Sequence, residues 1–118
     1  MADLESKNFD APDETRTFDK GKMDLITLGE TTIGRAVFEP VWKWSACLKP
    51  IVGTDSCQVA HTGYVVSGRM KVVMDSGPEG EAGPGDMFVI APGHDAWIVG
   101  DEPCVVLDVE GAPHYAKQ

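Results

Sequence analysis

The strongest constraint on the fold is a run of short segments with strand periodicity, separated by turn residues. These segments are KMDLITLG, TTIGRAVFEP, VWKWSACL, CQVAH, GYVVSGRMKVVMDSG, MFVI, WIVGDEP and CVVLDV. No window of eleven or more residues has helical spacing. We therefore expect about eight or nine strands at intervals of roughly 8–12 residues, which is typical of an all-β sandwich or barrel. A double-sheet jelly roll would hide the strand edges of so short a chain.

In two segments, apolar residues alternate with other residues regularly enough to predict which side chains face inward. VWKWSACL places Trp42, Trp44 and Ala46 on one face of a strand. In GYVVSGRMKVVMDSG, one parity predicts a buried face made of Tyr64, Val66, Met70, Val72 and Met74. MDSGPEGEAGPGD, which is rich in glycine and proline, is expected to be a loop.

Length and composition predict the organisation of the chain. At 118 residues, it has the length of one domain. Residues 1–20 are polar and are expected to form an arm that is either loose or docked on the body or on a second subunit. Residues 21–112 are expected to form the barrel, and residues 113–118 a tail in which His114 faces solvent.

The charge balance excludes two classes of partner. The 10 Lys+Arg residues against 19 Asp+Glu residues give a formal net charge of -9. Nucleic acids and anionic membranes bind clustered positive surfaces, so neither is an expected partner. No apolar run reaches the ~18–20 residues of a membrane-spanning helix, and MADLESKNFDAPDETR lacks the basic and apolar regions of a signal peptide. We expect a soluble, cytoplasmic protein.

The three cysteines are Cys47, Cys57 and Cys104. Their odd number, wide spacing and lack of a CxxC pair argue against a disulfide framework or a zinc ribbon. In a reducing cytoplasm they are expected to be thiols. Cys47 and Cys104 are interpreted as small buried hydrophobic residues.

Two segments resemble the two motifs of the cupins. GDMFVIAPGHDA (85–96) resembles the second motif, with a Gly-Asp pair, a short strand and a Pro-Gly turn. HTGYVVSGRM (61–70) resembles the first motif, which has a hairpin bend at Gly68. The resemblance implies a small single-domain cupin. Such a protein is an all-β, cupin-type double-stranded β-helix, that is, a jelly-roll barrel whose bore often holds a divalent metal.

The resemblance also implies ligand positions, and there this sequence departs from the family. The usual ligands are two His two residues apart, a Glu four residues after the second, and a His in the second motif. This chain has Asp55, Cys57 and His61 at the first three positions and Ala96 at the fourth. On an extended segment, residues 55, 57 and 61 would face one side, and His94 shares the parity of Ala96. Asp55, Cys57, His61 and His94 are thus the implied ligands of one divalent metal, namely zinc, nickel or iron.

A small molecule is the second expected occupant of the bore, because the usual His ligands are lost. Trp44, Trp97 and Tyr64 would give the bore an aromatic wall. His94 lies on a turn, and turn residues on a rigid barrel often contact ligands, so it is also a candidate ligand-binding residue.

Three classes of function are open at this point. The first is a module that binds a small apolar or acidic molecule, with or without a metal. The second is an enzyme, either metal-dependent (a dioxygenase, isomerase or lyase) or metal-free with His61 or His94 as general base. The third is a structural unit that only dimerises, because cupins commonly pair through a sheet face or by exchanging an N-terminal strand. We rank the binding module first and expect a homodimer. The fold alone does not choose among these chemistries.

Overall fold

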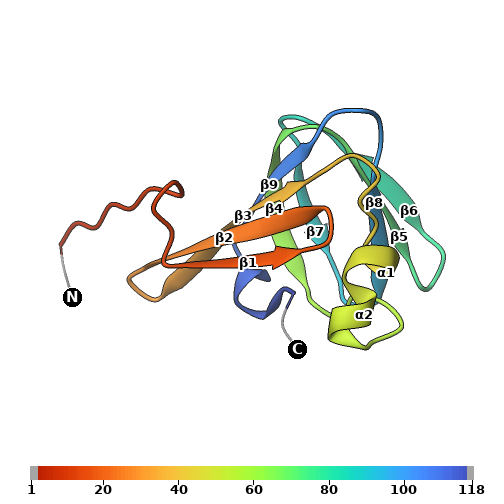
Figure 1. The fold of residues 1–118 in the computed structure, drawn as a ribbon, viewed down its shortest axis with the longest axis horizontal. Helices are drawn as coiled ribbons and strands as arrows, with labels where there is room; N and C mark the ends of the chain where they lie inside the picture. The colour runs from red at the N-terminus through yellow and green to blue at the C-terminus, as the bar shows by residue number, and fades with distance from the viewer. Residues whose placement is uncertain (1–2, 117–118) are drawn as a thin grey trace.

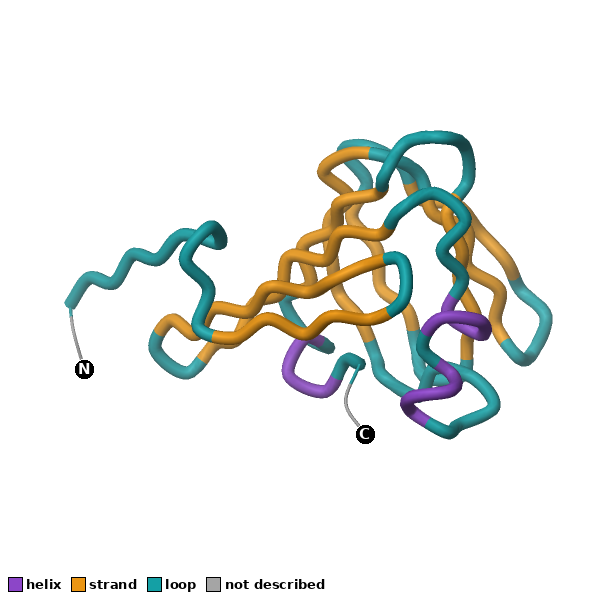
Figure 2. Tube along the Cα trace, viewed as in Figure 1, coloured by secondary structure: helices purple, strands orange, loops and turns teal. Residues whose placement is uncertain are grey.

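A computed structural model describes residues 3–116, and the regular structure there is mainly antiparallel β-strand (Figures 1 and 2). The strands are β1 (Glu14–Phe18), β2 (Gly21–Leu28), β3 (Thr31–Phe38), β4 (His61–Ser67), β5 (Met70–Met74), β6 (Glu79–Ala82), β7 (Met87–Ile90), β8 (His94–Ile98) and β9 (Cys104–Asp108). The helical segments are α1 (Trp44–Cys47), α2 (Lys49–Val52) and the 3₁₀ turn η1 (Ala112–His114). Within residues 3–116, no helix is long and apolar enough to cross a membrane.

The strands form two antiparallel sheets. The six-stranded sheet has the order β1-β2-β3-β9-β4-β7, and the three-stranded sheet has the order β6-β5-β8. In Figure 1 the smaller sheet lies at the right of the molecule. The core lies between the sheets, and its largest fully buried side chains are Trp42, Met23, Leu48, Val65 and Cys104. This arrangement confirms the expected all-β jelly roll.

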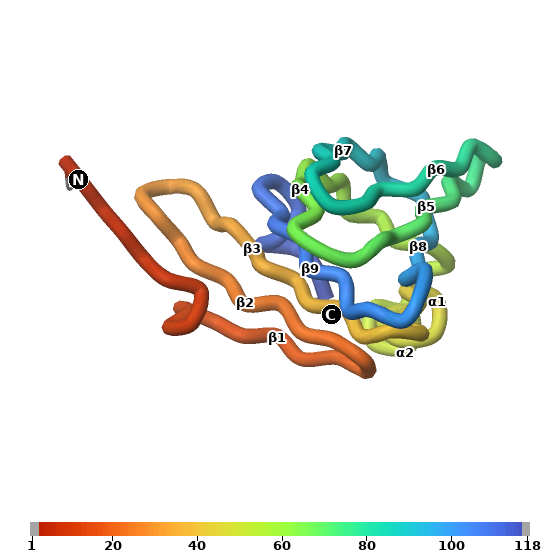
Figure 3. Tube along the Cα trace, turned by 90° about the horizontal axis from the view of Figure 1, so that it is seen from above, coloured from red at the N-terminus to blue at the C-terminus, as the bar shows by residue number. Residues whose placement is uncertain are grey.

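Strand β1 forms where the sequence predicts a polar arm. It pairs along its whole length with β2, so it is an edge strand of the larger sheet. The ring of Phe18 lies 6.0 Å from that of Phe38. Earlier in the arm, the guanidinium carbon of Arg35 lies 5.2 Å from the centroid of the Phe9 ring. Figure 3 shows β1 and β2 side by side along the edge of the molecule. Residues 9–18 of this segment therefore contact their own chain, and part of them form a strand.

The strand predicted for VWKWSACL is wrong, because this segment contains α1. Its apolar residues suit a helical turn equally well: Trp44, Cys47 and Leu48 stand at positions i, i+3 and i+4, and all three are buried. Pro50 lies in the first turn of α2. Backbone N–H groups there have no partner within the helix, so proline, which lacks an N–H, costs no hydrogen bond. Gly53, with a φ of 83°, ends α2 in the left-handed conformation.

The burial pattern predicted for Tyr64 and Val66 is also wrong. Their side chains are 38% and 48% exposed, whereas Val65 between them is fully buried. The register of β4 against β9 shifts between Val65 and Ser67, and the chain then turns at Gly68, where φ is 78°. A bulge and a turn each change which parity faces inward, so the parity of β5 does not carry back to β4.

The segment MDSGPEGEAGPGD, predicted to be a loop, contains strand β6. It pairs with β5 from Met70↔Ala82 to Val73↔Glu79. Three of its four residues are exposed, so it has no apolar alternation from which a strand could be predicted. Charged side chains on a short outer strand are a common protection against unwanted strand pairing.

Candidate metal centre

Three residues with metal-binding side chains meet inside the barrel from separate parts of the chain. His61 begins β4, His94 begins β8, and Cys57 lies in the connection before β4. One potential donor atom from each lies within 4.8 Å of the others, and all three residues are buried. A backbone bridge joins Cys57 to His94: the Cys57 N–H donates to the His94 carbonyl at 2.8 Å. This bridge holds the thiol next to the start of β8, so His94 lies on a strand and not on the predicted turn.

The ring of His61 is oriented by Asp108 at the end of β9. The His61 Nδ1 and the Asp108 Oδ2 lie 2.6 Å apart. The other carboxylate oxygen, Oδ1, accepts the backbone N–H groups of Glu110 at 3.0 Å and Gly111 at 2.8 Å. Since Asp108 is fixed on both sides, the His61 Nε2 is directed at the Sγ of Cys57, 3.7 Å away.

His94 is oriented in the same way by a backbone group. Its Nδ1 lies 2.8 Å from the carbonyl oxygen of Ala91. A carbonyl only accepts hydrogen bonds, so Nδ1 carries the proton and the neutral ring has its lone pair on Nε2. The rings of His61 and His94 are edge-on, with centroids 5.4 Å apart. Both histidines therefore use Nδ1 for support and have Nε2 available for a ligand.

The thiol and the imidazole stabilise each other's charged forms. Burial alone would raise the pKa of Cys57, but its contacts with His61 and His94 outweigh burial and lower the pKa to about 6. Burial alone would lower the pKa of His61, but the hydrogen bond to Asp108 and the contact with Cys57 raise it to about 9. By contrast, burial raises the pKa of Cys104 to about 11, so that thiol stays protonated.

A small cavity of about 40 Å³ adjoins the two histidines. At about 10–15 Å³ per water, it holds roughly three waters. Its polar groups come from His61, His94 and Asp108, and Trp42 and Trp44 contribute to its mainly apolar wall. Such a wall keeps bulk water away from any group bound at the histidines.

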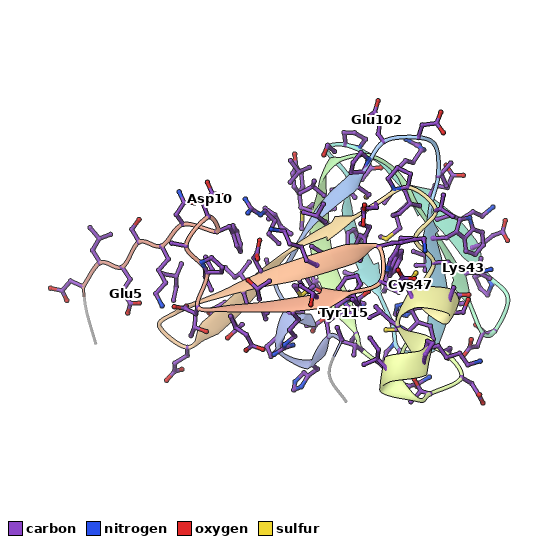
Figure 4. The ribbon with its side chains drawn as sticks, in the orientation of Figure 1. Glu5, Asp10, Lys43, Cys47, Glu102 and Tyr115 are labelled. Carbon is purple, nitrogen blue, oxygen red and sulfur yellow. The ribbon has the colours of Figure 1, made fainter. Side chains whose placement is uncertain are left out.

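Tyr115 closes this cavity from the C-terminal segment. It is 5% exposed, and its ring is edge-on to His61 with a centroid distance of 5.4 Å. The Nη1 of Arg16, on β1, donates to the carbonyls of Ala112 (3.1 Å), Pro113 (3.1 Å) and Tyr115 (2.8 Å). Figure 4 shows Tyr115 towards the interior, whereas Glu102 and Glu5 lie at the periphery. The arm is thus linked to the residue that covers the site.

The structure brings together three of the four ligand residues that the sequence suggested. Asp55 is not among them: its side chain is fully exposed, and its Oδ1 lies 4.0 Å from the Nζ of Lys49. The expectation that residues 55, 57 and 61 share one face of an extended segment is wrong. The chain bends around Asp55, and β4 begins only at His61.

The aromatic residues suggested as a ligand wall divide into two groups. Trp44 lines the cavity, although from α1 and not from a strand. Tyr64 points outward from β4. Trp97 lies on the outer face of β8, where the Nζ of Lys43 is 5.1 Å from its ring centroid. The structure therefore does not bring Tyr64 and Trp97 to the cavity.

Sequence reasoning missed two residues of the site. Asp108 shares the parity of the buried residues Cys104 and Val106 in CVVLDV, and an acid at an inward position is a signal that could have been used. Tyr115 lies in the predicted tail, outside any periodic segment, so no pattern indicated it.

Comparisons with known proteins agree with the fold. Residues 57–110 match the family described as Cupin domain. A sugar phosphate isomerase of the cupin superfamily from Silicibacter pomeroyi has a TM-score of 0.62 and 20% identity, covering 89% of this chain and 74% of that chain. A protein of unknown function from Rhizobium leguminosarum bv. viciae has a TM-score of 0.61 and 18% identity, covering 92% and 97%.

A third similar structure is the oxalate decarboxylase from Lactobacillus farciminis, with a TM-score of 0.60 and 14% identity. The match covers 94% of this chain but 35% of that one. No curated protein matches the chain. At these identities the solved structures support the fold and not a shared activity. Residues 57–110 thus match the Cupin domain family, and the two-sheet barrel has the fold of these similar structures.

Proposed function

We propose that the barrel binds one divalent metal ion of the zinc, nickel or iron(II) class through Cys57, His61 and His94. The observation that carries the proposal is the support of both imidazoles at Nδ1, by Asp108 and by the carbonyl of Ala91. Metal-binding histidines in proteins almost always have such a partner on the other ring nitrogen. The ligand atoms would be the Cys57 Sγ and the Nε2 atoms of the two histidines.

The donor set fits such an ion in distance and in chemistry. A sulfur at about 2.3 Å and a nitrogen at about 2.0 Å from one tetrahedral zinc are roughly 3.5 Å apart. The Cys57 Sγ and His61 Nε2 are 3.7 Å apart. A thiolate with two imidazoles suits zinc, iron(II) or nickel and disfavours calcium and magnesium. Three protein ligands leave a position for a small molecule.

The surroundings favour a binding role for a ligand of very few atoms. A bound ion would supply Lewis acidity to a molecule in the cavity. The chain itself orients His61 through Asp108, and the tryptophan wall and Tyr115 exclude water. A cavity of about 40 Å³ does not accommodate a sugar phosphate, the substrate class in the name of one similar protein. A metal-dependent enzyme with a small substrate is the alternative function.

Metal content tests this proposal. Protein purified without chelator and dialysed should hold about one metal ion per chain by elemental mass spectrometry. Cys57→Ala and His61→Ala should lose that ion, because each removes one of the three ligands. Cys104→Ala is the matched control, since it removes another buried thiol that lies outside the cluster. Absence of metal in the wild type after incubation with zinc, nickel and iron(II) would contradict the proposal.

We also propose that two copies pair through the outer face of β4 and β7. Four large apolar side chains are exposed there: Tyr64, Val66, Met87 and Val89. Tyr64 and Met87 are direct cross-strand partners, so the residues form one patch. An apolar patch on a single sheet face can pair with itself about a two-fold axis.

Light scattering after size-exclusion chromatography tests the pairing. The wild type should elute as a dimer, and Val89→Lys should shift it to a monomer, because Val89 is 79% exposed and is the most exposed of the four side chains. Thr32→Lys on β3 is the control for added charge. A Val89→Lys protein that remains dimeric would rule out this face.

A further inference from the structure

The barrel is open along one side, between β6 and β7. These two strands are the edges of different sheets, so no ladder joins them. Figure 3 places β6 and β7 along the same side of the molecule. A groove of about 370 Å³ follows this side, which we call the β6–β7 groove. Its volume lies within the range of about 300–1,000 Å³ that small-molecule sites have.

The floor of the β6–β7 groove is apolar, and the charges at its rim are already paired. Met70, Val72, Met74, Phe88 and Ile90 provide side chains from β5 and β7. At the rim, two carboxylates of β6 form ion pairs with cations in or just before β5. Glu79 pairs with Lys71 at 3.0 Å and Glu81 with Arg69 at 2.9 Å. An apolar floor with balanced charges suits a neutral, apolar occupant better than an ionic one.

The groove is continuous with the cavity at the histidines. Met70, Phe88 and Ile90 line both the groove and the cavity. A single layer of side chains therefore separates the two spaces. Methionine has several rotatable bonds and repacks at low cost, so Met70 is the side chain of this layer that moves most readily.

We propose that the β6–β7 groove binds a neutral apolar small molecule, one layer of side chains away from the cavity beside His61 and His94. This inference goes beyond metal binding, because the groove and its lining do not include a metal ligand. An added peptide strand is the competing occupant, since open strand edges can accept one. The apolar floor and its continuity with the cavity favour the small molecule.

Gly80 offers a way to fill the groove without disturbing the core. It pairs with Val72 in the β5–β6 ladder, so a side chain there would share the face of Val72. A Cβ at this position meets no atom within 4 Å, and the backbone is not in the left-handed region. The indole of Gly80→Trp should therefore occupy the groove itself.

Binding of N-phenyl-1-naphthylamine, a neutral apolar dye whose emission rises in apolar surroundings, tests the proposal in metal-free protein. The wild type should bind the dye saturably, and Gly80→Trp should bind it at least about 10-fold more weakly, which corresponds to about 1.4 kcal/mol. Glu102→Trp, on an exposed loop, is the matched control and should bind like the wild type. Because the protein in this assay is metal-free, its result is independent of that of the metal experiment.

Circular dichroism and thermal unfolding check that each variant is folded. If Gly80→Trp does not fold, Val72→Lys serves in its place, because the lysine stem fills the groove while its ammonium reaches water at the rim. Equal dye affinity in the wild type and a folded groove variant would overturn the proposal. Absence of dye binding, combined with self-association that Gly80→Trp abolishes, would overturn it in favour of an added strand.

Discussion

Asp108→Asn is expected to weaken metal binding by about 10–100-fold, the usual loss when the partner of a metal-binding histidine is altered. The Oδ1 of Asp108 accepts two backbone N–H groups, so the oxygen of the new amide should take that position. The amide nitrogen then faces the His61 Nδ1 and donates to it. The imidazole proton moves to Nε2, the atom directed at Cys57, and this nitrogen can no longer bind an ion. Competition against a chromogenic chelator measures the affinity.

Asp24→Asn is the matched control, because Asp24 is also a carboxylate that is only 3% exposed. It lies on β2, where it accepts a hydrogen bond from Thr15 at 2.8 Å and pairs with Arg35 at 3.3 Å. Its substitution should lower stability and leave metal affinity unchanged. If both variants lost affinity equally, the orientation of His61 by Asp108 would not be the cause.

The predicted strands agree with the structure where a segment carries its own evidence. TTIGRAVF and CVVLDV combine β-branched residues with adjacent turn or breaker residues, and they form β3 and β9. The prediction fails where contacts between residues far apart in the sequence determine the secondary structure. In VWKWSACL, the spacing of Trp44, Cys47 and Leu48 fits a helical turn as well as a strand, and packing into the core selects the turn. A pattern of eight residues does not separate these cases.

The prediction of the site residues also succeeds where the evidence is local in the sequence and fails where it depends on long-range contacts. Cys57, His61 and His94 stand at or near the motif positions of a known family, so the amino-acid sequence alone is enough to propose them. It does not indicate the partner of His61, because Asp108 is 47 residues away and only the pairing of β4 with β9 brings the two together. The prediction for Asp55 depends on parity, which holds only on a regular strand. The bends before Cys57 remove that condition.

Trp42→Ala is expected to lower the free energy of unfolding by about 3–5 kcal/mol, the usual cost of removing a fully buried Trp or Phe ring. Trp42 is 1% exposed, and its ring centroid lies 4.1 Å from that of Phe38 and 6.5 Å from that of Phe18. It therefore joins the β1–β3 strands to the barrel. Domains of this kind are stable by only about 5–15 kcal/mol, so urea denaturation should show a large shift of the midpoint.

Two further variants separate the causes of this loss. Trp97→Ala should cost far less, because Trp97 is only partly buried and faces outward under Lys43. Within residues 3–116, the Nε1 of Trp42 has no hydrogen-bond partner, so Trp42→Phe keeps much of the ring and removes an unsatisfied donor. Its cost should be well below that of Trp42→Ala. A Trp97→Ala protein as unstable as Trp42→Ala would show that the core is not centred on Trp42. Stability would then depend equally on the outer face of the smaller sheet.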